Sequence, residues 1–182
     1  MTNFEIKINI QSLDVIEKNL KRIGATYKYD MHQIDHYFGV GVFKEKIREI
    51  DNKEIQKISY HRNEISGKKE SNYSIKKINK EEKEKILNEE NILCVVEKIR
   101  KFWIYKNTRV HLDNVFGLGH FLELETVIKD ITQEEGLVEF KDVLKILKID
   151  IKESVACSYS DLILNNQKKY FTFVSTNKSV SF

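Results

Sequence analysis

The stretch Arg109–Glu125, RVHLDNVFGLGHFLELE, decides the fold because charged and apolar residues alternate along both of its halves. In an extended strand residues i, i+2 and i+4 share one face. The Arg, His and Asp of RVHLD (109–113) therefore point together, as do the two Glu of ELE (123–125). If the apolar residues between them pack on an outer layer, the charged face must line something polar and enclosed. A closed barrel with a charged lumen meets that requirement.

The beginning of the chain repeats this alternation. Glu5 and Lys7 share one face of an expected strand, and Phe4 and Ile6 share the other. By themselves Glu5 and Lys7 are better explained as a cross-strand ion pair on a solvated face. It is their combination with the later stretch that favours placement in a lumen.

Composition restricts the class of protein. The 182 residues are 41% hydrophobic and 32% charged, and the formal net charge is only +3. A chain of this length can bury the core of one domain, and its charge is too low for a nucleic-acid binder held by bulk electrostatics. The two cysteines have neither metal-site nor disulfide-framework spacing. With no signal peptide and no membrane-spanning apolar run, a cytoplasmic protein is expected.

Periodicity and turn residues predict the order of the elements. Strands are expected at residues 3–10, 25–40, 42–50, 54–62, 71–78, 92–105, 108–116 and 120–128. Helices are expected at 12–24, 79–90 and 132–147, and residues 63–70 are interpreted as a polar loop. Gly117 and Gly119 indicate a turn between strands. The prediction is an α+β fold of about eight antiparallel strands with helices packed outside. It forms a single domain over 1–182, with a core at about 3–164 and a tail at 165–182.

Charges of both signs in one cavity suit a polyphosphate with a divalent metal. Lys and Arg bind phosphate oxygens, and carboxylates hold Mg²⁺ or Mn²⁺. A triphosphate carries about four negative charges, so several cations and metals are electrically reasonable. The basic candidates at strand-face spacing are Lys7, Lys46, Arg48, Arg62, Lys98, Arg100 and Arg109. The acidic candidates are Glu5, Asp113, Glu123 and Glu125.

Several residues also have a structural interpretation that involves no ligand. Lys98 and Arg100 are also compatible with charges on an edge strand that discourage aggregation. His111 and His120 are interpreted as hydrogen-bonded structural residues and not as metal ligands. The sequence does not separate a ligand-binding role from simple packing for Ser71 and Tyr73.

Several short motifs together resemble the CYTH superfamily, which contains class IV adenylyl cyclases and thiamine and inorganic triphosphatases. The family's initial Glu-x-Glu-x-Lys is similar to Asn3–Lys7, and the segment Val110–Glu125 is the most distinctive match. The remaining matching motifs are Lys46-Ile47-Arg48, Tyr60-His61-Arg62, Lys69–Tyr73, Lys98-Ile99-Arg100 and Ser158–Leu162. These motifs occur in the family's order across residues 3–164.

The resemblance implies a triphosphate tunnel, which is a closed antiparallel barrel of eight strands whose lumen binds the triphosphate. By position, the implied metal ligands are Glu5, Asp113, Glu123 and Glu125. The implied phosphate ligands are Lys7, Arg48, Arg62, Lys98 and Arg100. In the cyclases of this family metals activate the ribose 3′-hydroxyl, which displaces pyrophosphate, whereas in the hydrolases water attacks the terminal phosphorus.

Three departures from the family pattern affect the expected activity. Asn3 replaces a carboxylate at a metal position, Lys46 replaces an Arg, and His61 stands where some cyclases have Lys. The leading expectation is a metal-dependent enzyme that converts ATP to cyclic AMP and pyrophosphate. Two alternatives are a thiamine or inorganic triphosphatase and a non-catalytic binder of nucleotides or polyphosphate. The organic part of the substrate is not determined, and a homodimer is left open.

Overall fold

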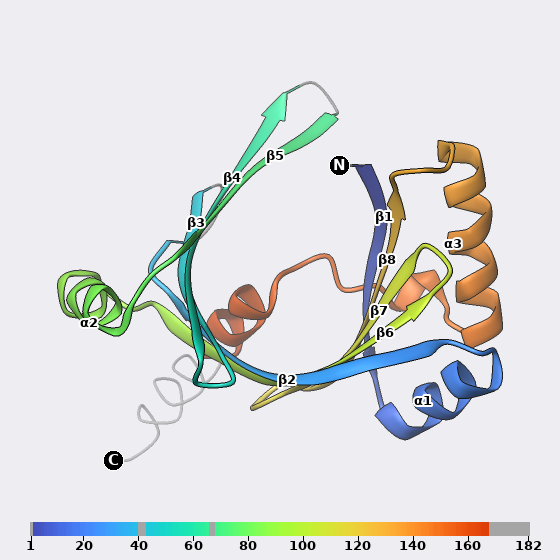
Figure 1. Ribbon diagram of the computed structural model, residues 1–182, viewed down its shortest axis with the longest axis horizontal. Helices are drawn as coiled ribbons and strands as arrows, with labels where there is room; N and C mark the ends of the chain where they lie inside the picture. The colour runs from blue at the N-terminus through green and yellow to red at the C-terminus, as the bar shows by residue number, and fades with distance from the viewer. Residues whose placement is uncertain (1, 40–42, 66–67, 168–182) are drawn as a thin grey trace, which may run out of the picture. The chain divides into compact units, whose positions relative to one another are not determined.

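The computed structural model describes residues 2–39, 43–65 and 68–167, which form an α+β structure (Figure 1). The strands are β1 (Thr2–Ile10), β2 (Thr26–Tyr37), β3 (Phe43–Ile50), β4 (Glu54–Ile65), β5 (Lys68–Lys77), β6 (Cys94–Tyr105), β7 (Thr108–Val115) and β8 (Gly119–Ile128). The helices are α1 (Leu13–Arg22), α2 (Lys80–Glu89), α3 (Gln133–Leu147) and the short 3₁₀ helix η1 (Ile151–Glu153). The strand order is β1-β8-β7-β6-β2-β3-β4-β5.

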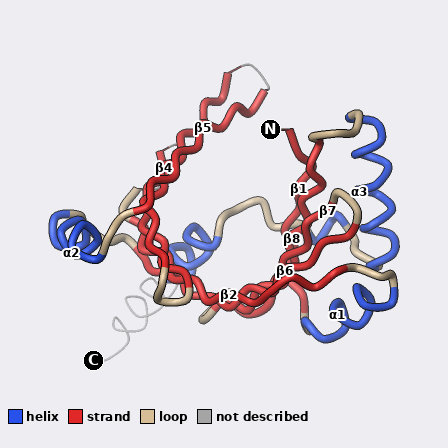
Figure 2. The backbone as a smooth tube through the Cα atoms, in the orientation of Figure 1, coloured by secondary structure: helices blue, strands red, loops and turns tan. Residues whose placement is uncertain are grey.

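The chain divides into two compact units. Unit 1 comprises Met1–His32 and Lys98–Ala156, and unit 2 comprises Gln33–Glu97 and Cys157–Phe182. Figure 2 distinguishes the strands of each unit from its helices. The strand order has β1 and β5 at its two ends in the described part of the chain, so the predicted closure into a barrel is not confirmed. The single-domain assignment stays a prediction.

In unit 1 the apolar face of the sheet packs onto helices, as predicted. β1, β8, β7 and the end of β6 pair in antiparallel order, with α1 and α3 against one face (Figure 1). That face and the two helices supply the buried residues Ile16, Leu20, Trp103, Val110, Leu112, Leu122, Leu124, Val143, Leu144 and Leu147. Because side chains alternate along a strand, burying this set directs the charged residues to the opposite face.

Unit 2 contains the end of β2 paired with β3, followed by β4 and β5 in antiparallel order. Asp51 and Asn52 form the predicted tight turn, with φ angles of 51° and 55°. Two successive positive φ values at the central residues define a type I′ β-turn, which the hydrogen bond from Lys53 N–H to the Ile50 carbonyl closes at 2.9 Å. The α2 helix has no buried residues and begins at Asn79, whose side chain accepts a hydrogen bond from the backbone N–H of Glu82. This helix is the solvated, charged one that was expected.

Two sequence-based expectations need correction. The predicted loop over residues 63–70 was wrong, because β4 continues to Ile65 and β5 begins at Lys68, with Glu64 opposite Lys69. The backbone ladder needs no apolar face, so a polar hairpin forms where composition indicated a loop. Residues 159–167 are helical, whereas the sequence analysis predicted no helix after residue 147. Most of the predicted tail lies outside the described residues.

In the described segments no helix has the length and apolar character needed to cross a membrane.

Replacing Leu124 by Ala is expected to lower the free energy of unfolding by about 2–5 kcal/mol, because Leu124 is fully buried between the sheet and the helices of unit 1. Denaturant unfolding followed by circular dichroism measures the change. The matched control is Leu137→Ala on α3, where the Leu is 37% exposed. Equal losses for the two variants would contradict this description of the core.

Candidate active site

The polar face of the unit 1 sheet carries charged residues in adjacent rows. Lys7 on β1 lies opposite Glu123 on β8, and Glu123 lies opposite His111 on β7. In the next row Glu5 lies opposite Glu125, which is opposite Arg109. Residues directly opposite each other in antiparallel strands share a face. The sequence-based prediction that these side chains point together is therefore confirmed.

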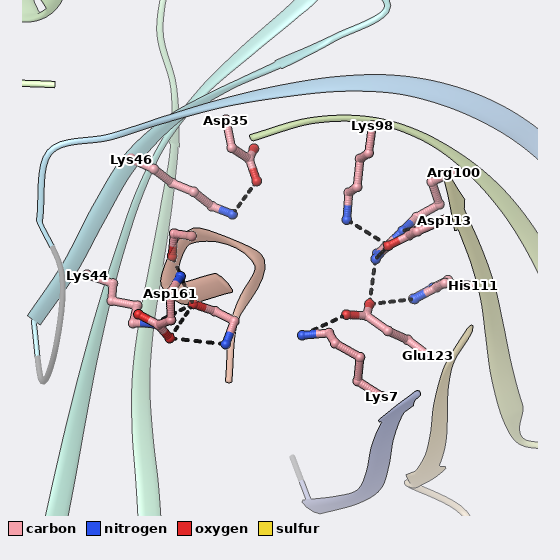
Figure 3. A network of polar contacts seen from close by, with 12 residues as sticks. Lys7, Asp35, Lys44, Lys46, Lys98, Arg100, His111, Asp113, Glu123 and Asp161 are labelled. Carbon is pink, nitrogen blue, oxygen red and sulfur yellow. Dashed lines mark hydrogen bonds and ion pairs between the residues drawn. The ribbon is translucent and has the colours of Figure 1, made fainter. Parts of the chain in front are cut away.

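Glu123 is the carboxylate on which the cations of this face converge (Figure 3). It forms an ion pair with Lys7 at 3.2 Å and accepts a hydrogen bond from Nη2 of Arg100. Its side chain is only 14% exposed. Burial alone would raise the pKa of Glu123, but the charge of Arg100 and further interactions outweigh it and hold the pKa well below its usual value. Glu123 is therefore ionised at neutral pH.

Asp113 is fully buried beside the same cations. Its carboxylate accepts hydrogen bonds from Nζ of Lys98 at 3.1 Å and from Nε and Nη2 of Arg100 at 2.6 Å each. Burial opposes ionisation, but Arg100 and then Lys98 outweigh it and lower the pKa of Asp113 to about 2. Lys98 and Arg100 are thus held side by side on β6 and point toward the polar face.

Glu5 and Glu125 bring like charges together across β1 and β8. The pKa of Glu5 is raised, first by partial desolvation and then by the negative charge of Glu123. Glu125 accepts a hydrogen bond from Nδ2 of Asn3 at 2.7 Å and another from Arg109 at 3.3 Å. Like charges directly opposite each other are destabilising. A bound cation would relieve this excess of negative charge.

His111 lies on this face without acting as a charged group. Its Nδ1 is 3.8 Å from the Glu123 carboxylate, and its ring lies 5.2 Å from that of Phe102. Burial first, and then the charge of Arg100, lower the pKa of His111. The interpretation of His111 as a hydrogen-bonded structural residue stays a prediction.

Unit 2 has its own pair of cations on β3. Lys46 donates a hydrogen bond to Oδ2 of Asp35 at 2.7 Å, and Arg48 donates to both carboxylate oxygens at 2.7 Å each. Asp35, on β2, is 2% exposed, and the sequence analysis did not identify it. Gln33, on the same face of the strand, is equally buried, and its Oε1 has no hydrogen-bond partner within the described residues. In the sequence, Gln33 and Asp35 are recognisable as polar residues at alternate positions of a stretch that otherwise has the pattern of a strand.

A second group in unit 2 ties β3 to the helical residues 159–167 (Figure 3). Lys44 donates hydrogen bonds to Oγ of Ser158 at 2.7 Å and to Oδ2 of Asp161 at 2.8 Å. Ser158 and Asp161 also exchange backbone-to-side-chain hydrogen bonds, which begin the helix as an N-terminal cap does. Burial works against ionisation of Asp161, but Lys44 and Ser158 outweigh it and lower its pKa.

The two units bring together different sets of the predicted site residues. Unit 1 brings together Glu5, Lys7, Lys98, Arg100, Arg109, Asp113, Glu123 and Glu125 on one face. Unit 2 brings together Lys46 and Arg48. Arg62 lies in β4, but its side chain is outside what the structure describes. Over the described residues, no group of three or more His, Cys, Asp or Glu is arranged to hold a metal ion.

Comparison with known proteins identifies relatives along most of the chain. The model of the CYTH domain family matches residues 1–159. A protein of Methanocaldococcus jannaschii named "Putative adenylate cyclase MJ0240" is 31% identical over 179 residues, covering 89% of this chain and 98% of that protein.

Solved structures share the fold at lower sequence identity. The PH1012 protein from Pyrococcus horikoshii OT3 has a TM-score of 0.74 at 21% identity, covering 88% of this chain and 99% of its own. A protein from Hippeastrum, described as "Putative adenylyl cyclase HpAC1" with a dominant triphosphatase activity, has a TM-score of 0.61 at 15% identity. The match covers 91% of this chain and 96% of that one.

Proposed function

Because this chain belongs to the CYTH domain family, we propose that it is a metal-dependent enzyme acting on a triphosphate-bearing small molecule. The leading reaction is conversion of ATP to cyclic AMP and pyrophosphate. The observation that carries the proposal is the face of the unit 1 sheet on which Lys7, Lys98 and Arg100 surround buried carboxylates. Closure of the eight strands into a tunnel, a cytoplasmic location and a homodimer remain predictions.

The cations have the chemistry to hold phosphate oxygens. Lys7 and Arg100 share Glu123, so an incoming phosphate would compete for donors that are already ordered. Ordered donors cost less to fix on binding than solvated side chains. In unit 2, Lys46 and Arg48 offer a second ordered pair. Arg62 and Arg109 are additional phosphate ligands in this proposal.

The carboxylates fit a divalent metal in donor type and charge. Glu5, Glu123 and Glu125 offer oxygen ligands, and the pKa of Glu5 is raised first by desolvation and then by the negative charge of Glu123. Mg²⁺ is usually held by one or two carboxylates together with substrate phosphates and waters, so a preformed cage of three ligands is not required. Asp113 is the fourth proposed ligand, although its carboxylate accepts hydrogen bonds from Lys98 and Arg100 in this structure.

A bound Mg²⁺ or Mn²⁺ would supply Lewis-acid activation of the attacking hydroxyl and neutralise phosphate charge. The chain's own contribution is to orient the triphosphate and to stabilise charge at its oxygens. Lys7, Lys98 and Arg100 serve this role for phosphoryl transfer, which depends chiefly on positioning and electrostatics. No covalent protein nucleophile is involved.

A triphosphatase is the second candidate. The same cations and carboxylates suit attack of water on the terminal phosphorus, and the Hippeastrum relative is described by its dominant triphosphatase activity. A non-catalytic binder is the third candidate, favoured by Asn3 at a position where the family has a carboxylate.

Product analysis by mass spectrometry distinguishes the three candidates. The protein is incubated with Mg²⁺ or Mn²⁺ and a panel of ATP, GTP, thiamine triphosphate and inorganic triphosphate. Cyclic nucleotide with pyrophosphate supports the cyclase, and orthophosphate supports the hydrolase. Triphosphate binding that is independent of metal and gives no product supports the binder. Absence of both product and binding would overturn the proposal.

Replacing Asn3 by Glu is expected to lower the Mn²⁺ concentration for half-maximal turnover by about tenfold, equivalent to about 1.4 kcal/mol of binding free energy. The new carboxylate adds an oxygen ligand, but it replaces the hydrogen bond from Asn3 to Glu125 with like-charge repulsion. The metal-free variant should therefore unfold at a lower temperature. Asn3→Gln keeps the neutral amide and is the control. An unchanged metal requirement in Asn3→Glu would exclude position 3 from the metal site.

A further inference from the structure

The Lys-Ile-Arg segments of the two units are each held by one buried aspartate. In unit 2, Asp35 accepts from Nζ of Lys46 and from Nε and Nη2 of Arg48, all at 2.7 Å. In unit 1, Asp113 accepts from the same three atoms of Lys98 and Arg100, at 3.1, 2.6 and 2.6 Å.

The backbone explains why the two arrangements agree. Arg48 lies directly opposite Asp35 in the β2–β3 pair, and Arg100 lies directly opposite Asp113 in the β6–β7 pair. In each case the Lys two residues earlier shares the face of the Arg and reaches the same carboxylate. We call each set, Lys46–Arg48–Asp35 and Lys98–Arg100–Asp113, a Lys-Arg clamp.

Stability alone gives little reason for these clamps. Desolvating ions costs several kcal/mol each, and apolar side chains of similar volume often stabilise a fold as well or better. Each clamp places two largely buried cations beside one aspartate, with side-chain exposures of 13% for Lys46, 17% for Arg48, 4% for Lys98 and 12% for Arg100. A fold is expected to bear this desolvation cost where the cations must meet an anion in a fixed orientation.

The geometry of Lys46 and Arg48 is fixed on several sides. Nζ of Lys46 donates to the hydroxyl of Tyr37 at 3.1 Å as well as to Asp35. Tyr37 and Asp35 are buried on the same face of β2. The bidentate contact to Asp35 orients the guanidinium plane of Arg48.

We propose that Asp35 is a positioning residue that holds Lys46 and Arg48 in the orientation that binds phosphate oxygens of the substrate. The inference rests on the proposed function, because it assumes that the two cations meet a polyphosphate. Asp35 itself touches the cations and not the substrate. Asp113 has the matching place in the unit 1 clamp.

Calorimetric titration of inorganic triphosphate without metal tests this role, because positioning and simple electrostatics predict opposite changes in the dissociation constant. Asp35→Asn removes a negative charge, so electrostatics alone would make the anion bind more tightly. Positioning predicts the reverse, a dissociation constant raised about 10- to 100-fold, as found when partners that orient binding groups are lost. A purely structural role would lower the fraction of competent protein, and hence the stoichiometry, with the dissociation constant unchanged.

Matched variants complete the test. Asp30→Asn alters an exposed aspartate of β2 that accepts from the hydroxyl of Tyr27, and it should leave affinity unchanged. Asp35→Glu keeps the charge but displaces the carboxylate, and it should also weaken binding. This variant provides the test if Asp35→Asn fails to fold. In an Arg48→Met background, Asp35→Asn should have a smaller further effect, because Lys46 is then the one clamp cation that Asp35 still orients.

The outcomes separate this inference from the proposed function. If the unaltered protein binds inorganic triphosphate and both Asp35 variants bind it equally or more tightly, the positioning role is overturned while the proposed function stands. If the unaltered protein fails to bind any triphosphate, both are overturned. Weaker binding by both Asp35 variants at unchanged stoichiometry supports the positioning role.

Discussion

Replacing Glu123 by Ala is expected to reduce metal-dependent turnover at least about 100-fold, because Glu123 combines two proposed roles. Its carboxylate is a proposed metal ligand, and it also holds the Lys7 ammonium at 3.2 Å and the Arg100 guanidinium. The variant thus loses an oxygen ligand and leaves two cations without their shared anion. The turnover number measured with saturating Mg²⁺ or Mn²⁺ reports the loss.

The control is Glu134→Ala, which removes an exposed carboxylate from the first turn of α3 in the same unit. Its turnover should match that of the unaltered protein. Retained activity in Glu123→Ala would remove Glu123 from the site. Loss of activity together with loss of the far-ultraviolet dichroism would instead indicate unfolding, and Glu123→Gln, of nearly identical shape, then repeats the test.

Replacing Arg100 by Met is expected to lower the free energy of unfolding by about 3–5 kcal/mol, the range observed when one partner of a buried ion pair is removed. Asp113, fully buried, would retain only the 3.1 Å contact to Lys98 among the two cations of its clamp. Glu123 would lose the same guanidinium. Urea unfolding at neutral pH measures the difference.

Arg109→Met is the matched control, since the Arg109 side chain is 46% exposed and pairs with Glu125 at 3.3 Å. Exposed ion pairs contribute about 0–1 kcal/mol. Adding Lys98→Met and Asp113→Leu to Arg100→Met removes all three ions of the clamp and should recover part of the lost stability. Comparable losses for the two Arg variants would show that the unit 1 clamp is not as desolvated as described.

The sequence was informative about elements whose two faces differ in polarity. β7 and β8 alternate apolar and charged residues, and the apolar set is the one that packs against α1 and α3. The β4–β5 hairpin was shortened in the prediction because Asn63–Glu64 and Lys68–Glu70 are polar on both faces. Periodicity is lost there, and only the backbone pairing defines the strand.

The beginning of the helix at residues 159–167 had a readable signal. Ser158-x-x-Asp161 is a capping pattern, and its hydrogen bonds are present in unit 2. The sequence analysis used this motif only as part of a family resemblance and not as a helix N-cap. As an N-cap it predicts the helix at residues 159–167.

The candidate site was predicted in its residue types but not in its pairings. Alternation placed Glu5 with Lys7 and Glu123 with Glu125, and the strand register shows that the two pairs share one face. Which carboxylate accepts from which cation depends on register and on competition between side chains, and neither is encoded in spacing. Asp35 was not predicted as a site residue because a single acidic residue in a strand is common. What distinguishes Asp35 is its burial opposite Arg48, and burial is seen only in the structure.

The two aspartates of the clamps affect the electrostatics of the protein when no ligand is bound. Each acts as a tethered counter-ion, so strongly basic strands can persist without recruiting anions from solution. Fewer mobile ions are then displaced when a polyanion arrives. Affinity should consequently fall less steeply with rising ionic strength than the number of Lys and Arg side chains alone would suggest.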